Sequence, residues 1–89
     1  MTINIFLSGL PEINPKKVKI NNIQTISMPL HKFLCDYLYE VYLIIFKEDD
    51  LKEGYVILLD GTNVMQLQGI NTKVVDGDTL VITAQVVGG

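Results

Sequence analysis

Few residues of this 89-residue chain belong to the types that do chemistry, and they are scattered. His31 is the single histidine and Cys35 the single cysteine. With only one imidazole available as a general base, we expect no Ser/His/Asp or Cys/His catalytic arrangement. We interpret His31 as a surface residue and Cys35 as part of the core. The carboxylates of Glu48, Asp49 and Asp50 lack the spacing of a calcium loop, which favours a solvated loop. The side chains therefore predict neither a metal site nor a self-sufficient active site.

The two glycines that end the sequence are different, because they offer a backbone carboxylate. Gly88 and Gly89 follow the run 79–87, in which Leu80 and Ile82 alternate with polar or outward residues as in a half-buried strand. Glycine has no Cβ, so two terminal glycines can pass through a channel that a side chain would block. We therefore expect a strand that leads into a flexible Gly-Gly tail, with the Gly89 carboxylate as the reactive group.

The composition favours one folded domain over residues 1–89. Hydrophobic residues make up 48% of the chain, which is enough for a core. The net charge is −3 and every basic residue is a lysine, so base-reading arginines are absent and nucleic-acid binding is not expected. No apolar run reaches the roughly 18 residues of a membrane span, and residues 1–7 lack the features of a signal peptide. We expect a cytoplasmic protein that binds no membrane.

The order of the predicted elements indicates an α+β fold. Apolar residues at helical spacing predict one long helix over residues 28–46, with Ser27 as its N-cap and Pro29 in its first turn. Alternating or continuous apolar runs predict extended segments at 2–7, 17–20, 23–26, 55–59, 64–67, 73–75 and 79–86. If the first and last strands pair, they run parallel and the helix supplies their crossover. This is the β-grasp, or ubiquitin-like, arrangement: one helix across a mixed sheet of about four to five strands.

A second apolar stripe lies on the far side of the predicted helix. Tyr39, Leu43 and Phe46 are spaced as neighbours on one helical face, opposite the main apolar stripe. Either residues 47–54 fold back and cover this stripe, or it is exposed and serves a partner or a second copy of the chain. The sequence leaves both interpretations open.

Residues 55–89 resemble the C-terminal half of a known family. They read Y-V-I-L-L-D-G-T-N-V-M-Q-L-Q-G-I-N-T-K-V-V-D-G-D-T-L-V-I-T-A-Q-V-V-G-G. A strand that ends in a turn, L-x-G-I-x-T before D-G-D, and a strand that ends in Gly-Gly occur in the same order in the MoaD/ThiS family of β-grasp sulfur carriers. The resemblance is strong over about the last third of the chain. The first half agrees in the order of elements and not in motif.

The resemblance implies a carrier that is a substrate of other enzymes and is not itself an enzyme. In this family an E1-like adenylyltransferase (MoeB/ThiF-like) uses ATP and magnesium to adenylate the C-terminal carboxylate, which here is that of Gly89. A sulfur donor then converts the adenylate to a thiocarboxylate. The carrier itself binds no cofactor. In MoaD-type proteins, the small subunits of molybdopterin synthase, the sulfur passes to a pterin precursor beside a MoaE-like large subunit.

The resemblance leaves the final acceptor open. MoaD proteins commonly carry a proline before the tail, where this chain has residues 84–87 as A-Q-V-V, which weakens MoaD against ThiS, the carrier of thiamine thiazole synthesis. The length of the chain and its region 47–54 favour MoaD or a ubiquitin-like modifier that forms isopeptide bonds with lysines. A β-grasp interaction module with an incidental Gly-Gly end is the remaining alternative.

Two further groups of residues are expected to contact the activating partner. Val86, Val87 and Gly88 would enter the mouth of its channel, unless the two valines only reflect strand propensity. Phe6 and Val81 are out of phase with their inward neighbours, so they should lie on the outward face of the sheet and form a docking patch. Alternatively, a loop covers Phe6.

Overall fold

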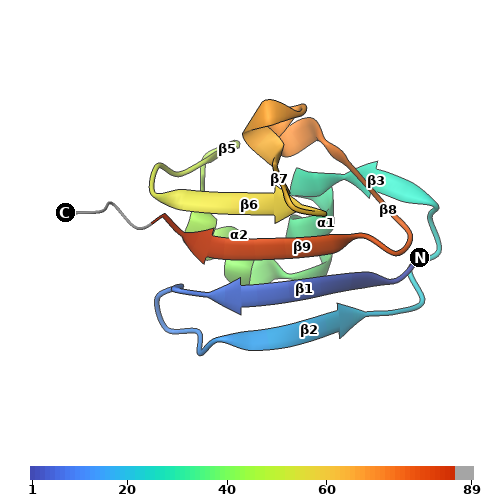
Figure 1. The fold of residues 1–89 in the computed structure, drawn as a ribbon, viewed down its shortest axis with the longest axis horizontal. Helices are drawn as coiled ribbons and strands as arrows, with labels where there is room; N and C mark the ends of the chain where they lie inside the picture. The colour runs from blue at the N-terminus through green and yellow to red at the C-terminus, as the bar shows by residue number, and fades with distance from the viewer. Residues whose placement is uncertain (86–89) are drawn as a thin grey trace.

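A mixed five-stranded sheet forms the body of the protein in the computed structural model, which describes residues 1–85 (Figure 1). The strand order is β2-β1-β9-β6-β7. The bounds of these strands are β1 Ile3–Ser8, β2 Lys16–Ile20, β6 Tyr55–Leu59, β7 Thr62–Asn63 and β9 Thr79–Ala84. β1 and β9 lie in the middle and run parallel, whereas β1–β2, β6–β9 and β6–β7 are antiparallel. The predicted β-grasp arrangement is confirmed.

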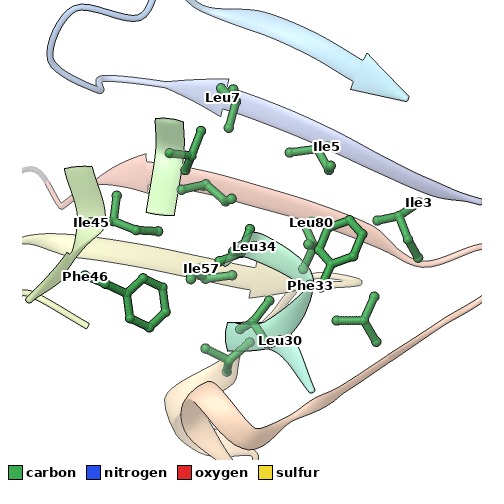
Figure 2. Close-up of a cluster of buried hydrophobic side chains, with 14 of the residues drawn as sticks. Ile3, Ile5, Leu7, Leu30, Phe33, Leu34, Ile45, Phe46, Ile57 and Leu80 are labelled. Carbon is green, nitrogen blue, oxygen red and sulfur yellow. The ribbon is translucent and has the colours of Figure 1, made fainter. Parts of the chain in front are cut away.

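The core lies between this sheet and two short helices behind it (Figures 1 and 2). Alternation along the two central strands decides which side chains face the helices. β1 buries Ile3, Ile5 and Leu7, and β9 buries Leu80 and Ile82. The helices contribute Leu30, Phe33, Leu34, Val41 and Ile45, all of them at most 2% exposed. Burial of this apolar surface is the main term that stabilises the fold.

The predicted helix 28–46 is wrong in its start and in its continuity. Ser27 is not an N-cap: β3 (Ser27–Pro29) pairs with β8 (Lys73–Val75) in a separate two-stranded sheet. The helix begins only at Leu30 and is interrupted at Leu38, which divides it into α1 (Leu30–Tyr37) and α2 (Tyr39–Ile45). Pro29 takes the N-cap position in an extended conformation.

The interruption at Leu38 has no local signal, because residues 30–53 contain neither proline nor glycine. Leu38 has φ −137° and ψ 55°, outside the helical region. Its N–H still donates to the Leu34 carbonyl at 2.9 Å, and its carbonyl accepts from the Tyr42 N–H at 2.9 Å. The backbone therefore remains bonded across the break, while each helix buries its own apolar stripe against the sheet. Tertiary packing overrides helical propensity here.

Residues 47–54 cover only one member of the second apolar stripe. Phe46 begins a hairpin of β4 (Phe46–Lys47) and β5 (Asp50–Leu51), in which it pairs with Leu51 and is 5% exposed. Tyr39 and Leu43 are 55% and 57% exposed. The stripe is therefore divided: Phe46 belongs to the core, and the other two side chains face solvent.

Two short segments predicted as extended differ from the prediction. Residues 64–67 are not a strand, because η1, a 3-10 turn (Val64–Gln66), starts there and is followed by η2 (Gly69–Asn71). The Asn63 side-chain oxygen accepts the Met65 N–H at 2.9 Å, a local bond that favours a cap over a continuing strand. Residues 23–26 are irregular. In residues 1–85, no helix is long and apolar enough to cross a membrane.

Candidate functional site

The site is built around the end of β9, where the chain leaves the sheet. β9 is hydrogen-bonded on both sides, since Thr83 pairs with Ser8 of β1 and Ala84 with Tyr55 of β6. The Gln85 N–H then donates to the Gly54 carbonyl at 2.6 Å. The body therefore holds the chain as far as Gln85. The predicted channel-binding residues Val86, Val87 and Gly88, and the predicted reactive Gly89, lie outside the described residues.

Glycines in two loops shape this exit. Gly9, with φ +67°, follows β1, and a Cβ on it would lie 3.4 Å from both the Cβ and the backbone N of Ala84. Gly54, with φ +93°, precedes β6 and carries the carbonyl that holds Gln85. Positive φ is easy only for glycine, so both loops can turn sharply beside β9. Backbone groups of two glycine loops therefore lie beside the last described residues of the chain, Ala84 and Gln85.

A row of side chains crosses the outward face of the sheet, which none of the described helices covers (Figure 1). Phe6 is 37% exposed and is the direct partner of Val81 on β9. Val81 in turn is opposite Leu58 on β6, and both are half-buried. Cross-strand partners share a face, so these three side chains form one apolar row, the outer-face row. The predicted position of Phe6 and Val81 on the outward face is confirmed, with Phe6 exposed and Val81 half-buried.

A lysine, rather than a loop, lies over Phe6. The Nζ of Lys17 on β2 is 5.3 Å from the centroid of the Phe6 ring, within the range of a cation–π contact. Lys19 follows on the same face and is the partner of Asn4. A depression of about 510 Å³ lies among these side chains and Thr79. This edge of the face is basic although the chain as a whole carries a net charge of −3.

Leu58 and Lys17 are missed by the sequence prediction of this patch. The run 55–59 is apolar at every position, so its alternation is invisible and a strand covered on both faces is expected. Only the β6–β9 register shows that Leu58 shares a face with Val81. The alternation of lysines with Val18 and Ile20 does place Lys17 outward. Its pairing with Phe6 depends on the β1–β2 register.

The D-G-D turn fixes the other end of β9. Asp76 accepts the Thr2 N–H at 2.6 Å, and the Gly77 N–H donates to the Thr2 carbonyl at 2.9 Å, so the turn is fastened to the start of the chain. Asp78 is buried and accepts the Val75 N–H at 2.8 Å. Burial, a hydrogen bond with Asp60 and the negative charge of Asp60 raise the pKa of Asp78, although its bond with the Val75 N–H acts in the opposite sense. The turn positions β9 and does no chemistry of its own.

The remaining chemistry-bearing side chains lie on α1 and in the β4–β5 hairpin. His31 and Cys35 are four residues apart on α1, so they are neighbours on one face of the helix. Both are half-buried, so the interpretations of His31 as a plain surface residue and of Cys35 as part of the core need correction. Glu48, Asp49 and Asp50 lie exposed in the β4–β5 hairpin, as a solvated loop should. Within residues 1–85, no three His, Cys, Asp or Glu side chains come together in a way that could hold a metal ion.

Comparison with known proteins finds similar structures but no matching sequence family or curated protein. Protein-family profiles and curated proteins give no match to this chain. A chain of the BexX/CysO complex from Amycolatopsis orientalis is similar with a TM-score of 0.71 at 21% identity, covering 98% of this chain and 99% of that one. Small archaeal modifier protein 1 from Methanosarcina acetivorans gives 0.65 at 23%, covering 99% and 96%. Urm1 from Trypanosoma brucei gives 0.59 at 16%, covering 99% and 95%. These likenesses establish a ubiquitin-like β-grasp fold.

Proposed function

We propose that this chain is a sulfur carrier whose Gly89 carboxylate is activated by an E1-like enzyme. One observation carries the proposal: the central strand β9 is held on both sides up to Gln85, next to two glycine loops, and only Val86, Val87 and the two glycines follow. In the proposed role, such a body presents the Gly89 carboxylate to the activating enzyme. The family resemblance of residues 55–89 and the fold shared with a small archaeal modifier point the same way.

The chemistry takes place on the partner. A carboxylate oxygen of Gly89 attacks the α-phosphorus of ATP, the bond to the β-phosphate breaks, and pyrophosphate leaves with its magnesium. The resulting acyl-adenylate is a good electrophile, because AMP is a far better leaving group than oxide. Hydrosulfide, HS⁻, attacks the carbonyl carbon, the bond to the AMP oxygen breaks and AMP departs, and loss of the S–H proton to solvent leaves a thiocarboxylate. The partner must exclude water during this sequence, since hydrolysis of the adenylate would regenerate the carboxylate.

The short tail requires close docking. Four residues follow Gln85, and four extended residues span at most about 14 Å. The α-phosphate on the activating enzyme must therefore come within that distance of the point where Gly54 holds the chain. Val86 and Val87 would lie at the mouth of the channel, with Gly88 and Gly89 inside it.

The outer-face row is the surface that we expect to dock. Phe6, Val81 and Leu58 offer apolar contact, and Lys17 and Lys19 line its edge on β2. A partner that fits this surface presents an apolar patch with carboxylates on one side. Charge complementarity of this kind orients the encounter and adds specificity.

Among sulfur acceptors, we favour the pterin precursor of the molybdenum cofactor. The chain would then be the small subunit of molybdopterin synthase beside a MoaE-like large subunit. The length of the chain and the β4–β5 hairpin support a MoaD-type over a ThiS-type carrier. A second candidate is a ubiquitin-like modifier, which the likeness to small archaeal modifier protein 1 favours. In that role a lysine amine, in place of sulfur, would attack the adenylate.

Intact mass distinguishes these functions. The full chain is incubated with a MoeB/ThiF-like enzyme, ATP and magnesium, with and without a sulfur donor, while pyrophosphate release is followed. A carrier releases pyrophosphate and gains the mass of one sulfur less one oxygen. A modifier gives a ladder of conjugates with lysine-bearing proteins. A β-grasp interaction module does neither, which would contradict the proposal.

Gly89→Ala tests the tail directly. We expect adenylation to fall by about 100-fold, because the added methyl group displaces the carboxylate in a channel that admits only glycine. A residue added after Gly89 should have the same effect. Thr25→Ala, an exposed substitution in the irregular segment before β3, is the matched control and should keep full activity. Thermal unfolding should be unchanged in all three proteins. A fully active extended variant would show that the terminal carboxylate is not the reactive group.

A further inference from the structure

A small pocket lies on the helix side of the molecule, formed by segments far apart in the sequence. It has a volume of about 230 Å³ and lies between α1, α2, the β4–β5 hairpin and η2. None of its lining residues belongs to the five-stranded sheet. It is therefore separate from the outer-face row and from the end of β9. Its volume is below the range typical of small-molecule sites, and a single side chain is the guest that suits it.

One wall of the pocket is aromatic. Tyr42 of α2 stacks on Phe46 with ring centroids 4.7 Å apart and an interplanar angle of 20°. Tyr39 continues the stack at 6.0 Å from Tyr42. Phe46 is buried and Tyr42 is half-buried, so the ladder runs from the core toward solvent and its inner two rings line the pocket. Tyr39 and Phe46 flank the Tyr42 ring, so this wall offers the pocket apolar ring surface on which the methylene stem of a long side chain can pack.

The other walls add hydrogen-bond acceptors and a negative charge. Asp49 and Asn71 are exposed at the pocket, and His31 of α1 is half-buried in it. Asp49 occupies the two-residue turn between Lys47 and Asp50, directly after Glu48, whose φ of 58° makes the turn tight. A carboxylate and an amide oxygen next to stacked rings suit a planar cation with several N–H donors.

We propose that this pocket binds an arginine side chain of a partner protein. The N–H groups of a guanidinium can donate to the Asp49 carboxylate and the Asn71 amide oxygen at once, which a compact ammonium does less well, while the methylene stem packs against the wall of Tyr42, Phe46 and Ile70. The sequence contains no arginine, so the guest comes from a different protein and not from a second copy of this chain. Because the pocket and the outer-face row lie on separate surfaces, one chain could bind both partners at once.

NMR titration with a small probe tests the pocket on the full chain. The probe is arginine with its amino group acetylated and its carboxyl group amidated, so that only the side chain carries charge. Saturable shifts are expected at residues 42–50, at 69–72 and on the His31 ring. The matched probes are citrulline capped in the same way, which has the same shape without charge, capped lysine, and free arginine. Capped arginine should bind more tightly than capped citrulline and capped lysine, and no less tightly than free arginine.

Variants distinguish binding of the probe in the pocket from general attraction of a cationic probe to an acidic protein. Asp49→Asn should weaken binding of the capped arginine about tenfold, and Tyr42→Leu should also weaken it. Glu53→Gln removes the same charge from an exposed residue outside the pocket and should leave binding unchanged. Tyr42→Phe keeps the ring and serves as the folding control. The proposal fails if citrulline or lysine binds as well as arginine, if free arginine binds more tightly, if Asp49→Asn and Glu53→Gln weaken binding equally, or if no saturable shifts appear. None of these measurements involves the C-terminal tail.

Discussion

At the scale of single residues, the described part of the site depends on backbone groups more than on reactive side chains. Gly54 contributes a carbonyl that accepts from Gln85, and Gly9 contributes the absence of a Cβ beside Ala84. This arrangement agrees with the proposed role, in which the body presents the Gly89 carboxylate. Asp78 is the clearest case of a side chain in an unusual environment, and its role is structural because it lies in the turn that positions β9.

Asp78 makes stability depend on pH. Burial, the hydrogen bond with Asp60 and the charge of Asp60 raise its pKa above 3.8 in the folded state. Folding therefore favours the protonated form, and this stabilising contribution is complete below the unfolded-state pKa. It is lost as the pH rises through the folded-state pKa. Ionised Asp78 carries its charge at a buried position beside the charge of Asp60.

We expect Asp78→Asn to stabilise the protein at pH 7. The amide oxygen can still accept the Val75 N–H, its NH₂ group can donate to Asp60, and the buried charge is gone. The gain should be about 0.5 kcal/mol, because Asp60 faces solvent and water screens the repulsion. Urea unfolding at pH 4 and pH 7 measures it. The difference from the unmodified protein should shrink at pH 4, whereas Glu53→Gln should show no such change. An equal difference at both pH values would contradict this account.

At the scale of elements, β9 has two faces with separate roles. Ile82 points toward the helices and is fully buried, while its neighbour Val81 lies half-buried in the outer-face row. Alternation along one strand thus separates the core positions from the outer-face row, the surface that we propose to dock. The tail begins where β9 ends. A shift in the register of β9 would therefore move the core face, the outward face and the start of the tail together.

Substitutions at these neighbouring positions should affect different properties: stability at Ile82 and docking at Val81. Ile82→Ala removes buried methyl groups and should lower the free energy of unfolding by about 3 kcal/mol. Val81→Thr keeps a β-branched residue with a hydroxyl that can reach water, so it should cost less than about 1 kcal/mol. If the proposed docking is correct, Val81→Thr should also raise the KM of the activating enzyme for this chain. Urea unfolding and pyrophosphate-release kinetics provide the two measurements. Equal stability losses would show that the outward face is as tightly packed as the core.

At the scale of the whole molecule, stability is concentrated in the middle of the sheet. β1 and β9 are each hydrogen-bonded to two neighbouring strands and carry much of the core. The β4–β5 hairpin pairs only two residues on each strand and is mostly exposed. The stable centre therefore holds β9, whereas the hairpin can open without unfolding the body.

Amide hydrogen exchange should reflect this distribution. We expect the slowest exchange at Ile5, Leu7 and Ile82, whose amides should open only when the whole domain unfolds. Amides of the β4–β5 hairpin and of the β3–β8 pair should exchange much faster, through local opening. Exchange followed by NMR at neutral pH measures both classes. Exchange in the β4–β5 hairpin as slow as in β9 would show that the domain opens as one unit.

The amino-acid sequence by itself determined the positions of β1, β2, β6, β8 and β9, a helical region between β2 and β6, the inward residues of β1 and β9, and the outward position of Phe6 and Val81. Hydrophobic periods of two and of about 3.6 residues are local signals, so they can be read from neighbouring positions. The sequence predicted a parallel direction for the first and last strands on the condition that they pair, and the β1–β9 register shows that they do.

Only the tertiary structure decided the break at Leu38, the place of Leu58 in the outer-face row and the joining of His31, Tyr42 and Asp49 in one pocket. The break depends on how two helical stripes pack against one sheet, and the row depends on the register between strands. The pocket depends on where a helix, a hairpin and a 3-10 turn come together. These features arise from contacts between distant segments, which no local period encodes.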